Sequence, residues 1–573
     1  MSEEVLEERK NKIFNYLKGN PAILVYIILA FIAWFGFYVR TRGMQFLIDV
    51  TTNDYIPSDP DAIGILRYVN YLVENGNLMS VDYMRYYPFG FTGIEEFQVL
   101  VYIIAWFYYI LHFLNSAITV NYADVMYPAF AFVVGLLFFF LFIKKVFNWK
   151  VALLASAFLT VLPAYLFRTM AGVSDKEALA MVFFYAGLYF FIAFFSETKL
   201  WKGGLYSFIA GISVGAVWCI WGGIVFISVS IGLFMLILIL LKKLSERNLW
   251  FYTIFLVTTI SFLAIFFTVR ASPVGILTAP ISGILFLVLF LGHLHNYIYT
   301  KDIIGIKKYY EKIAIFPPLL TLVLILTLGI ILILIFYGSS FITERIGNLY
   351  MDLIAPFSKN RWALTVAESH QPYFTDWVSQ FSMNYLVIVF FGAVFLFYET
   401  FKTLGKKAYY LAAAYAILLL AISLNRYSPS STLNGETTVS IIFYTGTILL
   451  FLIYMTYSFY MLYTKEHDSY KEFITHLSYG YLFVSIFFIF LLIGARSAMR
   501  LLFVFAPGTA IMAAFFVFFI VDYSKNFSTK PLRYGTWIVL AIFVFILLNS
   551  YSQSVIAQAS SSGNGYHEQW QYD

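Results

Sequence analysis

Three acidic segments lie beside long apolar stretches of the chain. They are Asp59-Pro60-Asp61, Ser174-Asp175-Lys176-Glu177 and Thr365-Val366-Ala367-Glu368. Hard divalent cations such as Mg²⁺ and Mn²⁺ prefer the oxygen ligands that carboxylates offer. A cation of this kind offsets charge that develops on a phosphate oxygen. If the fold brings the three segments to one face, they predict a metal-dependent site for a phosphate-bearing substrate.

Each acidic segment also has a purely structural interpretation. An Asp-Pro-Asp sequence is typical of a turn with solvated carboxylates. Ser174 or Asp175 can cap a following helix with Glu177 in its first turn, and capping does not exclude cation binding. Glu368 has no charged residue close by in the sequence, and the neighbouring His370 is more typical of a hydrogen-bonding loop residue than of a metal ligand.

Two arginines stand one helical turn apart at the start of an apolar run. Arg496 and Arg500 have the spacing that places two side chains on one face of a helix. They predict either a fork for a pyrophosphate at the membrane surface or ordinary contacts with lipid phosphates.

The composition predicts a membrane protein. Of the 573 residues, 61% are hydrophobic and 12% charged, and the mean hydropathy is +0.80. So few charges cannot cover a soluble protein of 65.9 kDa. A helix needs about 20 apolar residues to span a bilayer. Runs of this length predict an all-α polytopic fold with about 13–15 transmembrane helices: 21–39, 124–143, 150–168, 178–196, 204–220, 222–241, 250–269, 277–297, 313–337, 384–400, 408–424, 439–463, 477–494, 500–521 and 535–551.

Basic residues fix the expected orientation. Eight connections hold 24 of the 37 Lys and Arg residues and should face the cytoplasm. They alternate with the other connections only if the apolar segment 98–114 does not cross but is re-entrant or lies on the surface. The external loops are then 40–123 and 338–383, and all three acidic segments face outward. The net charge of +6 is explained by these cytoplasmic clusters and anionic lipid, so no nucleic-acid partner is expected.

The chain divides into three expected parts. Residues 1–20 are charged and predict a cytoplasmic segment rather than a signal peptide, because the apolar run that follows is too long. Residues 21–551 form the transmembrane catalytic domain. Residues 552–573 are polar and predict an external linker. Within the first loop, the stretch 61–76 predicts a helix that ends at Gly76.

Taken in order, the motifs resemble those of one family, the catalytic membrane subunit of oligosaccharyltransferase of the archaeal and eukaryotic type. The resemblance covers essentially the whole chain. It rests on Asp61 with Arg67 and Tyr87-Pro88-Phe89-Gly90, on the stretch from Pro163 to Glu177, on Trp221-Gly222-Gly223, on Thr365-Val366-Ala367-Glu368 with His370-Gln371-Pro372, and on Met499-Arg500-Leu501 with Ala506-Pro507. Each motif is weak alone, and their order on one side of a membrane makes the resemblance specific.

The resemblance implies a GT-C-type membrane domain and an N-glycosylation activity. The donor would be an oligosaccharide on a polyprenyl or dolichyl (pyro)phosphate, and the acceptor the asparagine of an Asn-X-Ser/Thr sequon. Asp61, Asp175 and Glu177 would hold Mn²⁺ or Mg²⁺, and Arg500 would bind the donor phosphate. Asp61 and Glu368 would accept the two N–H bonds of the acceptor amide, whose nitrogen is a poor nucleophile because of its conjugation with the carbonyl. Transfer would invert the anomeric carbon.

This sequence departs from the family in several ways. Ser369 is inserted between Glu368 and His370-Gln371-Pro372, and Asp59 competes with Asp61 for the first acidic position. Two apolar runs within 408–463 exceed the thirteen crossings of the family. The family continues into a soluble domain that contains Trp-Trp-Asp-Tyr-Gly, a string that does not occur here. We expect either a truncated chain or completion by a second polypeptide.

Other functions compete with this interpretation. A polyprenyl-phosphate-sugar transferase would also need an acidic first loop but not the Thr-Val-Ala-Glu segment. A non-catalytic or degenerate relative could bind or carry lipid-linked oligosaccharide in the membrane. The expected location is the plasma membrane of an archaeon with the site facing outside, or alternatively the endoplasmic reticulum membrane with a lumenal site.

Overall fold

The computed structural model describes residues 21–266, 280–302, 317–355 and 365–561, together with 305, 307 and 308. Regular structure in this part of the chain is helical, with three isolated β-bridges in loops. The predicted all-α class is therefore confirmed. The predicted segment 1–20 and the end of the predicted linker, 562–573, lie outside the described residues.

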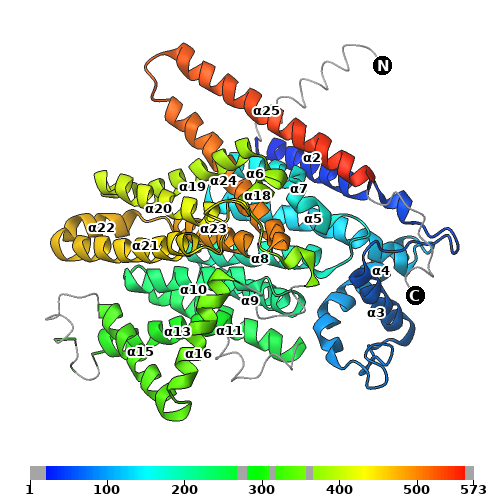
Figure 1. Cartoon of the computed structure of the whole chain (residues 1–573), viewed down its shortest axis with the longest axis horizontal. Helices are drawn as coiled ribbons and strands as arrows, with labels where there is room; N and C mark the ends of the chain where they lie inside the picture. Colours follow the sequence, from blue (N-terminus) through cyan, green and yellow to red (C-terminus); the bar gives the residue numbers. More distant parts are fainter. Residues whose placement is uncertain are drawn as a thin grey trace.

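The helices form one elongated bundle (Figure 1). Their bounds are α2 Pro21–Thr41, α3 Pro60–Asn75, α4 Gln98–Leu114, α5 Val120–Val146, α6 Trp149–Val161, α7 Pro163–Leu166, α8 Lys176–Ser196, α9 Leu200–Ile220, α10 Ile224–Leu240, α11 Glu246–Phe266, α13 Pro280–His295, α15 Pro317–Phe336, α16 Ser339–Ile354, α18 Phe374–Phe381, α19 Met383–Phe401, α20 Lys406–Leu424, α21 Thr438–Lys465, α22 His467–His476, α23 Tyr479–Ser497, α24 Leu502–Ser524 and α25 Lys530–Ser561. Short 3₁₀ turns that matter below are η3 Phe167–Thr169, η5 Ala367–Ser369 and η7 Met499–Leu501.

The apolar runs predicted from the sequence all appear as helices. Thirteen helices of the described chain are long and apolar enough to cross a membrane. One of these is the segment Gly93–Leu114, which contains α4. The pair α6 and α7 adds a further crossing that bends by 79° where Pro163 interrupts the helix. Two shorter apolar helices, Ile224–Leu240 and Gly283–Tyr299, match the two remaining predicted runs.

The contacts at the two ends of α4 are with neighbouring segments. Phe97, just before α4, packs on Tyr68 of α3 with ring centroids 5.7 Å apart. His112, near the other end, hydrogen-bonds through Nδ1 to the carbonyl of Ile118, two residues before α5 (2.9 Å). Because the segment Gly93–Leu114 is long and apolar enough to cross a membrane, the expectation that it does not cross stays a prediction.

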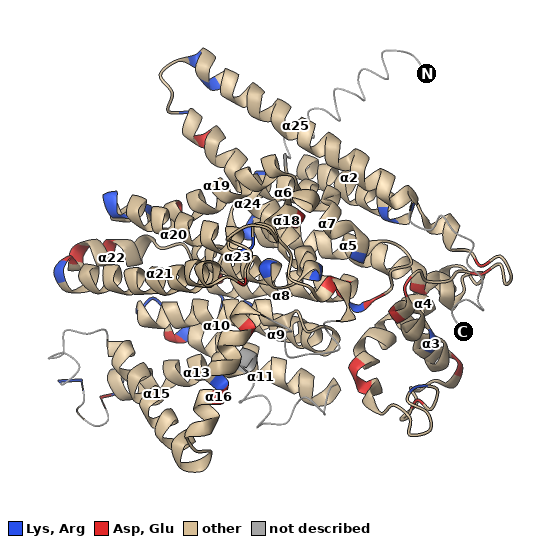
Figure 2. Ribbon diagram, viewed as in Figure 1, with Lys and Arg blue, Asp and Glu red and all other residues tan. Residues whose placement is uncertain are grey.

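Two contacts join connections that the sequence predicts to be cytoplasmic. Lys407, in the first turn of α20, pairs with Glu466 after α21 at 2.5 Å. Lys243, after α10, donates to the carbonyl of Thr475 at the end of α22 (3.2 Å). Figure 2 shows acidic residues around α3 and α4 at one end of the bundle, and both basic and acidic residues near α20 and α22 at the other. The orientation of the bundle in a membrane stays a prediction.

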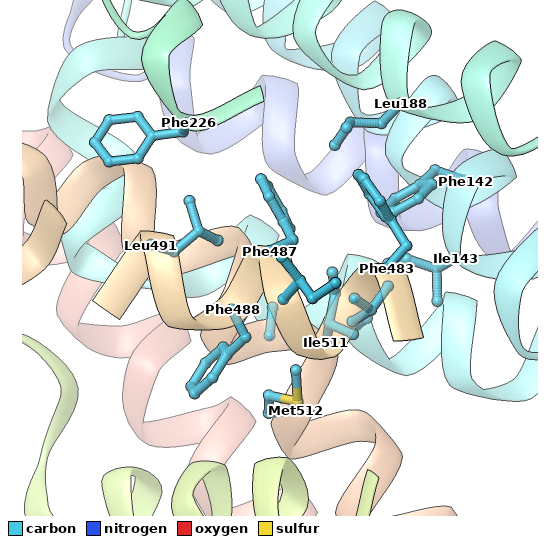
Figure 3. Close-up of a cluster of buried hydrophobic side chains, with 14 of the residues drawn as sticks. Phe142, Ile143, Leu188, Phe226, Phe483, Phe487, Phe488, Leu491, Ile511 and Met512 are labelled. Atoms are coloured by element: carbon cyan, nitrogen blue, oxygen red, sulfur yellow. The ribbon is translucent and has the colours of Figure 1, made fainter. Parts of the chain in front are cut away.

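Aromatic and aliphatic side chains fill the interior between α5, α8, α23 and α24 (Figure 3). Phe483 and Phe487 of α23 stack with ring centroids 6.0 Å apart. Gly392 of α19 lies directly against the main-chain oxygen of Met512 in α24, where a Cβ atom would overlap it. Close helix approach at a glycine is typical of membrane bundles. It brings α19 and α24 into close contact in the interior of the bundle.

The C-terminal helix is longer than predicted. α25 continues to Ser561, past the expected boundary at residue 551, so the first part of the predicted linker is helical. It lies beside α2, and Arg42 Nε donates to Ser560 Oγ at 2.7 Å. The two additional helices predicted within 408–463 are present as α20 and α21.

Candidate active site

The second acidic segment forms the start of α8. Asp175 is the N-cap and its carboxylate accepts from the amide of Lys176 at 2.8 Å. Glu177 lies in the first turn and is buried. Negative side chains are favoured at this helix end because unpaired amides and the helix dipole stabilise them. The capping interpretation is thus correct, and it leaves the other carboxylate oxygens available for additional partners.

Arg168 connects this segment to the third acidic segment. It lies in the turn η3, and its guanidinium is 3.4 Å from the carboxylate of Asp175 and 3.8 Å from that of Glu177. The same guanidinium donates to the carboxylate of Glu368. Three acids from two distant segments of the sequence therefore share one cation. Arginine suits this position because its planar fork offers several N–H donors in fixed directions.

Glu368 is held in place by the turn η5 and its neighbours. The carbonyl of His370 accepts from the amide of Met499 at 2.9 Å, which ties η5 to η7. Gln371 Nε2 donates to the carbonyl of Ile354, the last residue of α16, at 3.1 Å. These two bonds fix the segment that contains Glu368 despite the inserted Ser369, which is buried.

Asp61 stands in the first turn of α3, close enough to Asp175 for the two charges to repel. Burial, with repulsion from Asp175 and Asp59, raises the pKa of Asp61 above its ordinary 3.8. Asp59 has a different task, since it is the N-cap of α3 and accepts from the amide of Asp61 (2.9 Å). The structure therefore supports Asp61 over Asp59 as the residue that faces the site.

Arg67 has a partner that the sequence did not suggest. It lies six residues after Asp61 on α3, as predicted, but its guanidinium pairs with both oxygens of Asp82. Tyr68 donates to the same carboxylate at 2.8 Å. Burial opposes ionisation of Asp82, yet hydrogen bonds from Arg67 and Tyr68 hold its pKa below the ordinary value. Arg67 thus fastens the loop that follows α3 rather than contacting Asp61.

Arg496 does not form the predicted surface fork with Arg500. It is 2% exposed, and its Nε donates to Asn425 Oδ1 at 2.8 Å. Its Nη1 donates to the carbonyl of Leu353 in the last turn of α16 at 3.1 Å, a position where a cation satisfies unpaired helix carbonyls. Arg500, in contrast, is exposed in η7. Of the two arginines, Arg500 alone is accessible to a ligand.

The oxygen ligands that these carboxylates offer are of the type that a hard divalent cation prefers. Glu177 Oε2 is buried and has no hydrogen-bond partner in the described structure, although its neighbours are ionised groups. The carboxylates of Asp175 and Glu368 lie around the same arginine. Among the described residues no three His, Cys, Asp or Glu side chains are grouped closely enough to hold a metal as they stand. Cation binding would therefore require the Arg168 pairs to open.

Sequence reasoning missed the roles of Arg168 and of a buried aspartate, Asp124. Arg168 is the last residue of the predicted crossing 150–168, which is a signal for a functional charge near the membrane surface. Asp124 is likewise an acid inside the apolar run 124–143 and is completely buried. Both signals were available from the sequence alone.

Comparisons with known proteins show the family to which the chain belongs. The chain matches the family model of oligosaccharyl transferase STT3, N-terminal part, over residues 25–374. The STT3 subunit of the Saccharomyces cerevisiae dolichyl-diphosphooligosaccharide–protein glycosyltransferase is 25% identical over 401 residues, 65% of this chain and 51% of that protein.

Solved structures of archaeal proteins share the fold. The Archaeoglobus fulgidus oligosaccharyltransferase AglB, in complex with an inhibitory peptide and a dolichol-phosphate, matches with a TM-score of 0.64 at 16% identity, over 97% of this chain and 57% of that one. Another structure of the Archaeoglobus fulgidus oligosaccharyltransferase, with Zn and sulfate, matches with a TM-score of 0.55 at 16% identity, over 95% and 54%. The chain thus spans about half the length of the proteins that it matches.

Proposed function

Because the chain belongs to the STT3 oligosaccharyl transferase family, we propose that it transfers an oligosaccharide from a polyprenyl or dolichyl (pyro)phosphate to the asparagine of Asn-X-Ser/Thr sequons. The observation that carries this proposal is the joining of Glu368 to Asp175 and Glu177 by Arg168. It brings together acids that lie about 200 residues apart in the sequence. A single ion pair would be enough to join the two segments, so three carboxylates around one arginine indicate a role beyond holding them together.

The acceptor amide is the first chemical difficulty. Its nitrogen shares a lone pair with the carbonyl, so it attacks poorly unless the N–H bonds are oriented and that conjugation is weakened. Glu368 has a side chain 43% exposed, and Asp61 is also accessible. We assign to these two carboxylates the task of accepting the two N–H bonds of the amide.

The leaving phosphate is the second chemical difficulty. Asp61, Asp175 and Glu177 would hold Mn²⁺ or Mg²⁺, which supplies a positive charge to a phosphate oxygen as the glycosidic bond breaks. Arg500 would bind another phosphate oxygen through its exposed guanidinium. Attack from the face opposite the phosphate inverts the anomeric carbon. Support for bound ligands comes from the Archaeoglobus proteins, whose structures contain a peptide and dolichol-phosphate in one case and Zn and sulfate in another.

The location follows from charge. Basic residues near α20 and α22 lie at the end of the bundle away from α3 and α4 (Figure 2), and basic connections tend to remain in the cytoplasm. We therefore place the site on the outer face of an archaeal plasma membrane or, alternatively, in the lumen of the endoplasmic reticulum. In both cases the sugar donor and the acceptor polypeptide meet outside the cytoplasm.

The test is glycopeptide formation by the purified chain with lipid-linked oligosaccharide, Mn²⁺ and a labelled sequon peptide, with and without EDTA. We expect product that EDTA abolishes and that Asp61→Ala and Glu368→Ala each reduce by at least ~100-fold. Glu436→Ala, an exposed acid in the loop between α20 and α21, is the control and should keep full activity. Donor binding without any product would instead support a lipid-oligosaccharide carrier.

A further inference from the structure

A buried acid lies directly behind the start of α8. Asp124, in the second turn of α5, has no exposed surface. Its Oδ2 accepts a hydrogen bond from Ser174 Oγ at 2.6 Å. Its Oδ1 has no hydrogen-bond partner in the described structure. One neutral hydroxyl is poor compensation for a buried carboxylate, which usually requires an opposite charge.

The same stretch of α5 holds the segment 172–175 at two more points. The amide of Gly172 donates to the carbonyl of Val125 at 2.9 Å. The hydroxyl of Tyr127 donates to the carbonyl of Asp175. Together with the bond from Ser174 to Asp124, three contacts from α5 fix the backbone immediately before and at the N-cap of α8. The direction of the Asp175 side chain therefore depends on α5.

Gly172 makes this close approach possible. Its φ of +87° is a conformation that other residues rarely adopt, and a Cβ atom there would overlap the side chain of Leu47. The turn between η3 and α8 can therefore approach α5 closely enough for the amide of Gly172 to donate to the carbonyl of Val125. Asp124 is the acidic residue that contacts the turn from this stretch of α5.

We propose that Asp124 is a positioning residue that, through Ser174, orients Asp175 for binding a divalent cation. The proposal rests on the function proposed above, in which Asp175 and Glu177 are cation ligands. Partners of this type hold a ligating carboxylate in one orientation, and their loss typically weakens metal affinity by about 10–100-fold. Asp124 itself touches neither substrate nor cation.

Two substitutions change this contact from its two sides. Asp124→Asn keeps the size but leaves an acceptor on one side of the group only. Ser174→Ala removes the hydroxyl that donates to Asp124. Asp54→Asn is the matched control, because Asp54 accepts from the N-cap of the same helix, Thr119, at 2.9 Å and does not contact Ser174.

The measurement is equilibrium binding of Mn²⁺ to the full chain in nanodiscs, followed by the electron paramagnetic resonance signal of free Mn²⁺. We expect Asp124→Asn and Ser174→Ala each to weaken Mn²⁺ affinity by about tenfold or more. The thermal midpoint without metal should stay within a few degrees of wild type, and Asp54→Asn should bind Mn²⁺ normally. If Asp124→Asn does not fold, Ser174→Ala decides the matter.

The outcomes are distinct. Unchanged Mn²⁺ affinity in a folded Asp124→Asn or Ser174→Ala protein, with binding by the wild type intact, overturns the role of Asp124 alone. Absence of Mn²⁺ binding to the wild type overturns the metal part of the proposed function and this inference with it. Equal weakening by Asp54→Asn shows a general charge effect and also overturns positioning through Ser174.

Discussion

The guanidinium of Arg168 donates to the carboxylate of Glu368 from a position where it also faces Asp175 and Glu177. A loop between distant helices is thereby attached to the start of α8. The attachment is electrostatic and partly open to water on the Glu368 side. It can consequently separate when other partners for these carboxylates arrive.

We expect Arg168 and Glu368 to act as a unit. Arg168→Gln removes the shared cation, and Glu368→Gln removes one acceptor. Because both changes break the same contact, the double variant should lose less activity than the two single losses combined, with a coupling on the order of 0.5–3 kcal/mol. The measurement is kcat/KM for glycopeptide formation by the four proteins. Strictly additive losses would show that the ion pair has no part in the reaction.

Arg496 and Arg500 should differ sharply in what they support. Arg496→Met leaves Asn425 and the carbonyl of Leu353 without donors inside the protein, which costs about 1–3 kcal/mol for each unsatisfied group. Arg500→Met removes an exposed side chain and should weaken binding of the lipid donor. Thermal unfolding and donor binding, measured on both variants, check the contrast. A stable Arg496→Met protein would contradict the conclusion that Arg496 stabilises the end of α16.

Local signals explain why much of the fold could be predicted. The helix α3 begins at Pro60, directly after its N-cap Asp59, and ends before Gly76, which has a φ of +76°, close to the predicted stretch 61–76. The crossings are equally local, since each is defined by its own apolar run. The side of the membrane on which Asp175 lies stays a prediction from the basic connections.

Pairings across the fold could not be predicted in this way. The partner of Arg67 is Asp82 and the partner of Glu368 is Arg168, and neither choice is encoded in spacing along the chain. Arg496 seemed available to a phosphate because of its position at a helix end. It is buried because α16 and the loop after α20 cover it, an arrangement that only the packed bundle determines.

A glycine in the bundle gives a test of the packing. Gly392→Ala should destabilise the protein by about 1–3 kcal/mol, because its methyl group would overlap the main-chain oxygen of Met512, which cannot move without α24. Gly446→Ala, in α21, is the control, since its methyl group would meet only Ile442 at 3.8 Å. Replacing glycine by alanine in an open helix position should instead stabilise slightly. Thermal midpoints of the two variants in the same detergent provide the comparison. Equal midpoints would show that α19 and α24 are further apart than described.

The loop after α3 should respond to acid through Asp82. Burial disfavours the charged carboxylate, but the hydrogen bonds from Arg67 and Tyr68 outweigh it and hold the pKa of Asp82 below its ordinary value. A carboxyl group with a lowered pKa in the folded state stabilises that state above the pKa of the unfolded chain, about 3.9. That stability disappears as the pH falls through the folded-state pKa.

Asp82→Asn should therefore be less stable than wild type at neutral pH, and the difference should shrink as the pH falls below about 4. Hydrogen exchange of peptides that cover 82–91, compared between the two proteins at each pH, measures this difference locally. Glu436→Gln, an exposed acid on the same side of the bundle, should show no pH-dependent difference from wild type. A gap between Asp82→Asn and wild type that stays constant from neutral to acidic pH would mean that the Arg67–Asp82 contact contributes through shape and not through charge.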